Sequence, residues 1–472
     1  MATPIPSNRA AFRLGEVAEI TGGALHGKDV ACQGVSSDTR AALGGQLFVA
    51  LAGASFDGHR FIEDALAKGA VAVLSERPLP PNVNGVVVPS TLLALGELGR
   101  AHRQRWGGKL VAVAGSAGKT TTKSIIAALF RHELGSRVHV APGNLNNQIG
   151  VPMVLLGLEE QHSAAIVELG TNHTGEVPAL VHCSRPDFAV LTLIDLEHTE
   201  GLGGIDAIEL EEGAVYRSPL DVALGNADDA LVLRQLRAAN AVRKLGYGFC
   251  SAADYRIHGA TLTAECTTRL ELERPDRTRL SLTTPWLGTP GALSTTAAIA
   301  ALEAYRGANL DPTWIAEALA QPGLREAGRL QPFELGDGSL VIDDSYNANP
   351  ASVRTALAVA REVASLRNAR LLVVLGEMRE LGKWSQSEHE GLRPAIAAAQ
   401  PSSVFAIAGD AKYWAQPGSA AANAEFFPDS SSAARRITGA VKPGDVVLVK
   451  ASRGVRAELV VQALVNDRGL RA

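Results

Sequence analysis

An apolar run at residues 111–114 passes directly into a segment rich in glycine and hydroxyl side chains. That segment consists of Gly115, Ser116, Ala117, Gly118, Lys119, Thr120 and Thr121. Where a glycine-rich loop connects a strand to a helix, the backbone N–H groups of the loop can donate to phosphate oxygens. The positive end of the helix dipole also faces the bound anion. A lysine at this place can reach the terminal phosphates, and a threonine can bind Mg²⁺. We therefore predict a strand, a phosphate-binding loop and a helix.

The loop departs by one residue from the strict pattern G-x-x-x-x-G-K-[ST]. Val113 stands where the first glycine belongs, which leaves the shorter pattern G-x-x-G-K-T. The alternative interpretation is a glycine-rich turn with an exposed lysine and no ligand. The assignment therefore depends on polar residues elsewhere in the chain.

The length and composition of the chain limit the classes of protein to which it can belong. With 472 residues, the chain is too long to fold around one ordinary hydrophobic core, and roughly 150 residues per domain predicts about three domains. Hydrophobic residues make up 46%, charged residues 20% and aromatic residues 5%, which is typical of a soluble α/β enzyme. The formal net charge of −4 argues against a nucleic-acid partner.

Cysteine usage and hydropathy predict the compartment. The four cysteines, Cys32, Cys183, Cys250 and Cys266, form no C-x-x-C pair, so we expect reduced structural thiols. No run of about 18 apolar residues is present, and the opening lacks the apolar centre of a signal peptide. We expect a cytoplasmic protein without membrane insertion.

The order of apolar runs predicts an α/β fold with three domains. We expect a small N-terminal α/β domain at 1–106, a central parallel-sheet domain with the phosphate loop at 107–316, and a Rossmann-like α/β domain at 317–472, after a linker with Pro322. Near-continuous apolar runs are typical of parallel strands that are buried on both faces. Central strands are expected at 110–114, 164–167 and 188–194, a helix around 295–305, and C-terminal strands at 340–342, 371–375, 404–408 and 446–449.

Glu168 and His198 lie at or just beyond the carboxyl ends of two predicted central strands. Ligands of open parallel sheets bind at this edge, so both side chains are expected to face one site with Lys119 and Thr120. A carboxylate and an imidazole suit Mg²⁺ that is held partly by nucleotide phosphates. The alternatives are an exposed or helix-capping carboxylate and a hydrogen-bonded loop histidine.

Several further motifs carry a resemblance to a known family. They are residues 37–40 (SDTR), 56–59 (FDGH), 143–152 (GNLNNQIGVP), 168–173 (ELGTNH), 343–350 (DDSYNANP), 375–382 (LGEMRELG) and 449–454 (VKASRG). Together with the loop they resemble the Mur ligase family, and the match spans nearly the whole chain. The asparagine-rich and tyrosine-asparagine motifs distinguish it from folylpolyglutamate synthetases.

The resemblance implies an ATP-dependent amide ligase with Mg²⁺. The first domain is expected to hold a UDP-sugar (a UDP-N-acetylmuramoyl tripeptide), the middle domain ATP, and the third domain to close over both. A peptide carboxylate takes the γ-phosphoryl group, and the amine of D-alanyl-D-alanine displaces phosphate from the acyl phosphate. Such catalysis is mostly positioning and charge neutralisation. We expect a monomer.

The family pattern assigns roles to named residues. Lys119, Glu168 and His198 are expected to be catalytic, and the loop residues Gly115–Thr121 with Arg329 and Asn347 to bind ATP. The expected magnesium ligands are Thr120, Glu168, His198 and Glu212. The expected substrate contacts are Ser37, Asp38, Thr39, Arg40, Asn144, Asn146 and Asn147. For the asparagines and for residues 37–40, turn and helix-cap chemistry is the alternative.

Three positions depart from the family pattern. Glu212 stands where relatives usually carry a carbamylated lysine, so it either supplies a permanent carboxylate to a second metal or belongs to a solvated acidic face. Leu193 replaces an asparagine, and Pro290-Gly291 replaces a His-Asn pair that contacts the nucleotide. Two other functions stay open: an amide ligase with a different amine or carboxylate substrate, and a non-catalytic nucleotide-binding protein.

Overall fold

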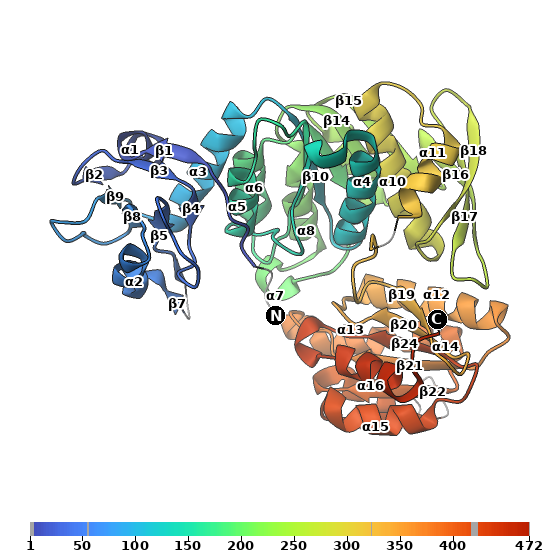
Figure 1. The fold of residues 1–472 in the computed structure, drawn as a ribbon. Helices are drawn as coiled ribbons and strands as arrows, with labels where there is room; N and C mark the ends of the chain where they lie inside the picture. Colours follow the sequence, from blue (N-terminus) through green and yellow to red (C-terminus); the bar gives the residue numbers. More distant parts are fainter. Residues whose placement is uncertain (1–3, 54–55, 322, 417–422, 472) are drawn as a thin grey trace.

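The computed structural model describes residues 4–53, 56–321, 323–416 and 423–471, so Pro322 of the expected linker lies outside the described residues. The predicted α/β organisation in three domains is confirmed. Figure 1 shows the N-terminal domain in blue, the central domain in cyan to yellow and the C-terminal domain in orange and red. The two outer domains both attach to the central one and lie apart from each other.

The N-terminal domain is a small sheet with flanking helices. Its elements are β1 (Ala11–Arg13), α1 (Leu14–Thr21), β2 (Ala24–His26), β3 (Ala31–Gln33), β4 (Val35–Ser36), β5 (Leu47–Val49), β6 (Ala52–Gly53), β7 (Phe56–Asp57), α2 (Ile62–Ala67), β8 (Ala72–Ser75), β9 (Gly85–Val87) and α3 (Thr91–Arg105). The main sheet has the order β2-β9-β8-β5-β4, in which only β2 runs antiparallel to its neighbour.

The central domain begins at the strand of the phosphate loop. Its elements are β10 (Lys109–Ala114), α4 (Lys119–Leu134), β11 (Val138–Val140), α5 (Gly150–Leu156), β12 (Ala164–Glu168), α6 (Glu176–Ser184), β13 (Phe188–Leu191), α7 (Thr199–Leu202), α8 (Ile205–Glu212), β14 (Leu220–Asn226), α9 (Ala230–Ala238), β15 (Ala241–Gly248), β16 (Tyr255–Leu262), β17 (Thr268–Glu273), β18 (Arg279–Thr284), α10 (Gly288–Arg306) and α11 (Pro312–Leu319). The sheet order is β11-β12-β10-β13-β14-β15-β16-β17-β18.

Alternate residues of β10 point into two separate cores, as the period of a strand requires. Val111 and Val113 pack into one core with α4 and α10, and Leu110, Ala112 and Ala114 pack into the other with α5 and α6. Both faces of the sheet are therefore covered by helices. This explains why the strand sequences are continuously apolar.

Two expectations for the central domain need correction. The sheet is mixed, because β16, β17 and β18 form an antiparallel extension that the run analysis did not predict. The strand expected at 188–194 ends at Leu191. Thr192 Oγ1 donates to the carbonyl of Ala117 at 2.6 Å, and the carbonyl of Leu193 accepts from the N–H of Ser116 at 2.7 Å. These residues hold the phosphate loop and do not continue the strand.

The C-terminal domain is a largely parallel sheet between two helical layers. Its elements are β19 (Gln331–Glu334), β20 (Leu340–Asp344), α12 (Pro350–Leu366), β21 (Leu371–Gly376), α13 (Ser385–Gly391), α14 (Arg393–Ala399), β22 (Ser403–Ile407), β23 (Ala424–Phe427), α15 (Ser430–Ala440), β24 (Val446–Lys450) and α16 (Glu458–Arg468). The order is β19-β20-β24-β21-β22-β23, with only β19 antiparallel. The boundary expected after residue 316 falls inside α11, which packs on α4 and β18.

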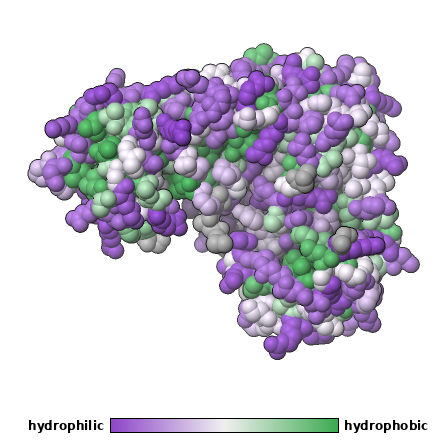
Figure 2. Space-filling model, viewed as in Figure 1, coloured by the Kyte–Doolittle hydropathy of each residue, from purple (hydrophilic) through white to green (hydrophobic). Residues whose placement is uncertain are grey.

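The outer domains share apolar contacts with the central domain. Met153 and Leu156 of α5 belong to the N-terminal core, and Leu262 and Cys266 at the tip of the β16–β17 hairpin belong to the C-terminal core. Figure 2 shows a wide notch on the visible face between the N-terminal and C-terminal domains. Among the described residues, no helix is long and apolar enough to cross a membrane.

Candidate active site

The phosphate loop joins β10 to α4 in a conformation that its glycines make accessible. Gly115 has φ +124° and Gly118 has φ +83°, both in the left-handed region. A Cβ atom on Gly115 would lie 2.9 Å from the carbonyl oxygen of Leu193, so no larger residue fits there. Thr120 and Thr121 lie in the first turn of α4, and Thr120 is buried. The sequence pattern and the local structure agree in this segment.

Lys119 is held by carbonyl and carboxylate oxygens. Its Nζ donates to the carbonyl of Gly115, lies 3.3 Å from Glu197 Oε1 and lies 3.9 Å from Glu212 Oε1. Burial lowers the pKa of Lys119, but the charges of Glu197 and Glu212 outweigh this and hold it above its usual value. Lys119 is therefore a firmly charged ammonium group beside the loop.

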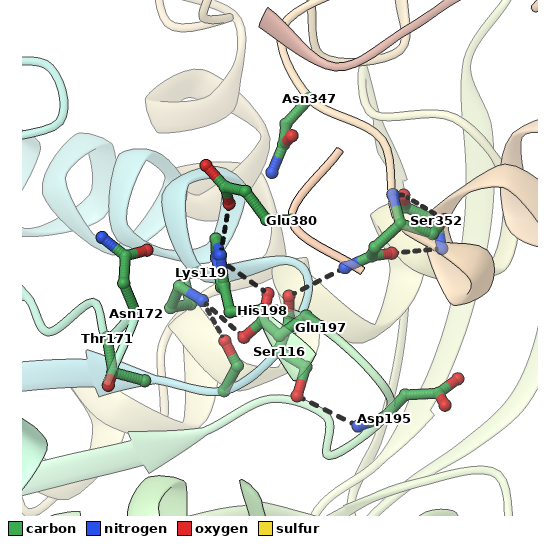
Figure 3. Close-up of polar contacts among 12 residues, drawn as sticks. Ser116, Lys119, Thr171, Asn172, Asp195, Glu197, His198, Asn347, Ser352 and Glu380 are labelled. Atoms are coloured by element: carbon green, nitrogen blue, oxygen red, sulfur yellow. Dashed lines mark hydrogen bonds and ion pairs between the residues drawn. The ribbon is translucent and has the colours of Figure 1, made fainter. Parts of the chain in front are cut away.

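Glu197 is a residue that sequence analysis missed. It is buried directly before His198 and reaches both Lys119 and, at 3.8 Å from its Oε2, Nε2 of His198. Figure 3 shows Glu197 between these two side chains. Its position directly before His198, a predicted metal ligand, is the sequence feature that could have indicated Glu197 as a site residue.

Glu168 ends β12 and is buried at 2% exposure. Its Oε1 accepts from Asn146 Nδ2 at 2.8 Å, and its Oε2 lies 3.5 Å from Lys123 Nζ without a hydrogen-bond partner. Burial raises the pKa of Glu168, but nearby positive charges, Lys123 foremost, outweigh burial and hold it below its usual value. The site thus contains an ionised carboxylate, one oxygen of which accepts no hydrogen bond and faces the Lys123 ammonium group.

Lys123 lies one helical turn after Lys119 and was also missed. It is 2% exposed, and its Nζ donates to the carbonyl of Gly143 at 2.6 Å and lies 3.6 Å from Glu326 Oε1. The i, i+4 spacing of the two lysines indicates that both side chains lie on one face of the helix. Lys123 therefore ties the phosphate helix to Glu168 and to the segment that leads into the C-terminal domain.

Glu212 lies beneath the phosphate loop and is fully buried. Its Oε2 accepts from the N–H of Gly115 at 2.7 Å, and its Oε1 has no hydrogen-bond partner. Burial raises the pKa of this carboxyl group to about 8. The interpretation of Glu212 as part of a solvated acidic face is therefore wrong.

His198 adopts φ +46° at the start of α7. Its Nδ1 lies 2.5 Å from Glu380 Oε2 of the C-terminal domain, a close ion pair although no hydrogen bond of regular geometry forms. Burial lowers the pKa of His198, but the Glu380 and Glu197 carboxylates outweigh it and raise that pKa above its usual value.

Two domains enclose a cavity of about 420 Å³ beside the loop. Predicted nucleotide residues that line it are Ser116, Ala117, Gly118, Thr121, Arg329 and Asn347. The substituted positions Leu193, Pro290 and Gly291 also line it, together with Trp286 and Val359. The volume suits a small ligand, and its neighbour Lys119 suits an anionic one.

The C-terminal wall of the cavity is built from paired charges. The Arg329 guanidinium lies 4.2 Å from the centre of the Tyr346 ring, and its Nε is buried without a hydrogen-bond partner. Lys450 Nζ lies 2.6 Å from Asp344 Oδ2 and donates to the carbonyl of Asn347 at 2.9 Å. These contacts place two cations against the cavity from the domain opposite the loop.

The other predicted substrate residues lie in two places. Ser37, Asp38, Thr39 and Arg40 follow β4 in the N-terminal domain, where the Asp38 carboxylate pairs with Arg40 at 2.6 Å. The Arg40 hydrogen bonds to Asp38 hold the pKa of that carboxyl below its usual value.

Asn144, Asn146 and Asn147 precede α5. Asn147 Oδ1 accepts from the N–H groups of Ile149 and Gly150, which is the turn chemistry considered as the alternative for the asparagines. The carbonyl of Asn144 accepts from the N–H of Asn146 at 2.8 Å.

The carboxylates of the site are candidate magnesium ligands. Among the residues described, no three His, Cys, Asp or Glu side chains lie close enough to hold a metal ion together. The buried oxygens Glu168 Oε2 and Glu212 Oε1 accept no hydrogen bond, and they fit a cation that takes its remaining ligands from phosphate and water. Both oxygens lie within the charged surroundings of Lys119 and Lys123.

Comparison with known proteins places this geometry in a family. Three family models match: "Mur ligase family, catalytic domain" at residues 31–103, "Mur ligase middle domain" at 113–302 and "Mur ligase, glutamate ligase domain" at 328–453. The chain is 34% identical to the UDP-N-acetylmuramoyl-tripeptide--D-alanyl-D-alanine ligase of Escherichia coli (strain K12), covering 96% of this chain and 98% of that protein. It is 31% identical to the enzyme of that name from Bacillus subtilis (strain 168), covering 92% and 93%.

Solved structures agree with the sequence relatives. A crystal structure of MurF from Acinetobacter baumannii matches with a TM-score of 0.85 at 27% identity, covering 98% of this chain and 100% of that one. MurF ligase from Thermotoga maritima in complex with ADP matches with a TM-score of 0.79 at 26% identity, covering 92% and 97%. The chain belongs to the Mur ligase family.

Proposed function

We propose that the chain is an ATP-dependent ligase that joins D-alanyl-D-alanine to a UDP-N-acetylmuramoyl tripeptide in the synthesis of peptidoglycan precursors. The observation that carries the proposal is the cavity that the phosphate loop shares with Arg329 and Asn347. The near-complete coverage of relatives with this activity supports the choice of substrates.

The proposed reaction has two steps. An oxygen of the tripeptide carboxylate attacks the γ-phosphorus of ATP, and the bond from that phosphorus to the β,γ-bridging oxygen breaks, so ADP leaves with the electron pair. The D-alanyl-D-alanine amine then attacks the acyl carbon, loses a proton and expels inorganic phosphate. Lys119 stabilises charge that develops on the phosphoryl oxygens, and Arg329 approaches from the opposite domain.

Mg²⁺ fits the carboxylates of this site. We assign Thr120 and Glu168 to one ion, and Glu168 with His198 to a second, at which Glu212 supplies a further carboxylate. When bound, the ions neutralise phosphate charge and orient the carboxylate. Asn146 donates to Glu168 Oε1 and the Lys123 ammonium group lies 3.5 Å from Oε2, so the carboxylate is held in a fixed direction.

Glu212 takes the place of the carbamylated lysine in this proposal. Its carboxylate needs no CO₂, so we expect the rate to be unchanged within about 1.5-fold on adding or removing bicarbonate. Glu212→Ala should lower kcat by about 10²-fold, the scale of losing an electrostatic contact in a closed site. Phosphate release in CO₂-depleted buffer with and without bicarbonate is the measurement.

An unchanged rate in a folded Glu212→Ala protein would contradict the proposal, because the reaction would then not use this carboxylate. Dependence of the unmodified protein on bicarbonate would contradict it too. Glu209→Ala serves as the control, since Glu209 lies on the same helix and pairs with Arg234 away from the loop.

We place the UDP-sugar at Ser37–Arg40 of the N-terminal domain and the peptide near Asn144, Asn146 and Asn147. In this proposal the peptide reaches the phosphate loop through the notch between the outer domains, which Figure 2 shows. With Pro290 and Gly291 at this position, the nucleotide base would contact an apolar wall of the cavity that also contains Trp286. We also propose that the chain acts as a monomer in the cytoplasm.

Phosphate release with substrates omitted one at a time tests the function. Release that needs ATP, the UDP-tripeptide and D-alanyl-D-alanine together is the expected result. Release with another amine or carboxylate but not with these would favour a ligase with a different substrate. Nucleotide binding without release on any substrate pair would favour the non-catalytic alternative.

A further inference from the structure

An ion pair between the central and C-terminal domains joins His198 to Glu380 at the site. Glu380 Oε2 lies 2.5 Å from His198 Nδ1, and the two side chains come from the C-terminal and central domains (Figure 3). We propose that Glu380 is a positioning residue that fixes the His198 imidazole, so that the metal site is complete only while these two domains are closed. This inference rests on the proposed function.

The segment that carries Glu380 is firmly held by its own domain. His389 Nε2 accepts from the N–H of Met378 at 3.0 Å, and Ser452 Oγ accepts from the N–H of Arg379 at 2.9 Å. Glu380 itself has φ +65°, an uncommon conformation for a residue with a side chain. The backbone that carries this carboxylate is therefore fixed to the C-terminal domain.

The histidine side of the contact is held by the same segment. The carbonyl of Glu380 accepts from the N–H of Glu200 at 3.2 Å, and the carbonyl of Leu381 accepts from Thr199 Oγ1 at 3.0 Å. Gly382 packs on Glu200 so closely that an added Cβ would lie 3.3 Å from its Cα. Opening the domains would break all three contacts together with the Glu380–His198 pair.

The ion pair with Glu380 sets which nitrogen of the His198 ring faces the interior of the site. With Nδ1 against Glu380, Nε2 faces Glu197, which is in turn 3.3 Å from Lys119. A carboxylate on one ring nitrogen fixes the ring and strengthens the other nitrogen as a metal ligand. The Glu380 side chain is 61% exposed, and such exposed ion pairs contribute little to stability, so its placement is better explained by orientation.

Glu380→Ala and Glu380→Gln test this role, with Glu388→Gln as the matched control from the same domain. Glu388 lies in the first turn of α13, within the C-terminal domain. The readouts are kcat, the Mg²⁺ concentration for half-maximal rate, and Mn²⁺ binding to the AMPPNP complex followed by electron paramagnetic resonance.

We expect Glu380→Ala to lower kcat and to weaken Mn²⁺ binding at one site by about 10- to 100-fold each, as for other partners of metal-bound histidines. Affinity for ADP should change less than about 2-fold, because the phosphate loop is on the other domain. Glu380→Gln keeps an oxygen for Nδ1 and should recover most of the loss. Glu388→Gln should match the unmodified protein.

Unchanged Mn²⁺ binding in a folded Glu380→Ala protein overturns the inference, as does an equal loss in Glu380→Gln and Glu380→Ala. A lower melting temperature with unchanged kcat overturns it as well, since that pattern marks a purely structural contact. If the unmodified protein forms no product, the proposed function fails, and the Mn²⁺ titration still decides the role of Glu380.

Discussion

Lys119→Ala is expected to reduce kcat by about 10³-fold or more, the effect of removing one cation that stabilises a transferring phosphoryl group. The ammonium group of Lys119 is buried beside the loop, and the charges of Glu197 and Glu212 keep its pKa above the usual value. Alanine removes the positive charge and leaves two acidic groups facing the phosphate. Steady-state phosphate release measures the loss.

The same substitution should leave binding of the UDP-tripeptide nearly unchanged, because that substrate is assigned to the N-terminal domain. Calorimetry of this substrate separates a catalytic effect from misfolding. Lys109→Ala is the matched control, since Lys109 is at the opposite end of β10, paired with Asp187 and Asp221. Equal loss of turnover and of UDP-substrate binding would contradict the assignment of Lys119.

Glu168→Gln is expected to lower kcat by about 10²- to 10³-fold, the scale of losing a charge that acts in a closed site. Glutamine keeps an oxygen for Asn146 Nδ2 but removes the charge that faces Lys123. The loss should be accompanied by a rise in the Mg²⁺ concentration that gives half the maximal rate. Initial rates over a Mg²⁺ series measure both effects.

Glu159→Gln is the control for Glu168→Gln, because Glu159 precedes β12 at an exposed position away from the loop. It should retain the full rate and Mg²⁺ dependence. A Glu168→Gln protein whose kcat falls with no change in Mg²⁺ dependence would argue that Glu168 positions Lys123 and does not bind metal.

The phosphate loop and Glu168 were predictable because both depend on local pattern. A buried parallel strand has a continuous apolar sequence, so the polar residue that ends it marks the edge where ligands bind. That reasoning placed Glu168 at the end of β12, where the structure also has it. Thr120 and Thr121 followed directly from the helix that begins at Lys119.

Residues that act across long distances in sequence could not be found in this way. Glu380 reaches His198 only because two domains meet, and no local period encodes that meeting. Asn146 donates to Glu168, which lies 22 residues away, and no local pattern indicates this contact. The β16–β18 extension was not predicted, because its strands alternate buried and exposed residues and lack the continuous apolar runs of the central strands.

Glu212 lies at a position that the family resemblance identifies as unusual, because a carboxylate stands where relatives usually carry a carbamylated lysine. The structure adds that this carboxylate accepts from the N–H of Gly115 at 2.7 Å and lies 3.9 Å from Lys119 Nζ. The residue is therefore part of the support of the phosphate loop.

The most direct test of the proposed ligase is mass spectrometry of both products from a UDP-tripeptide labelled with ¹⁸O in its reacting carboxylate. Protein, ATP, Mg²⁺ and D-alanyl-D-alanine complete the mixture. A pentapeptide product together with one ¹⁸O atom in the released phosphate is predicted, because the carboxylate oxygen passes to phosphorus in the acyl phosphate. Unlabelled phosphate, or phosphate without any pentapeptide, would contradict the account.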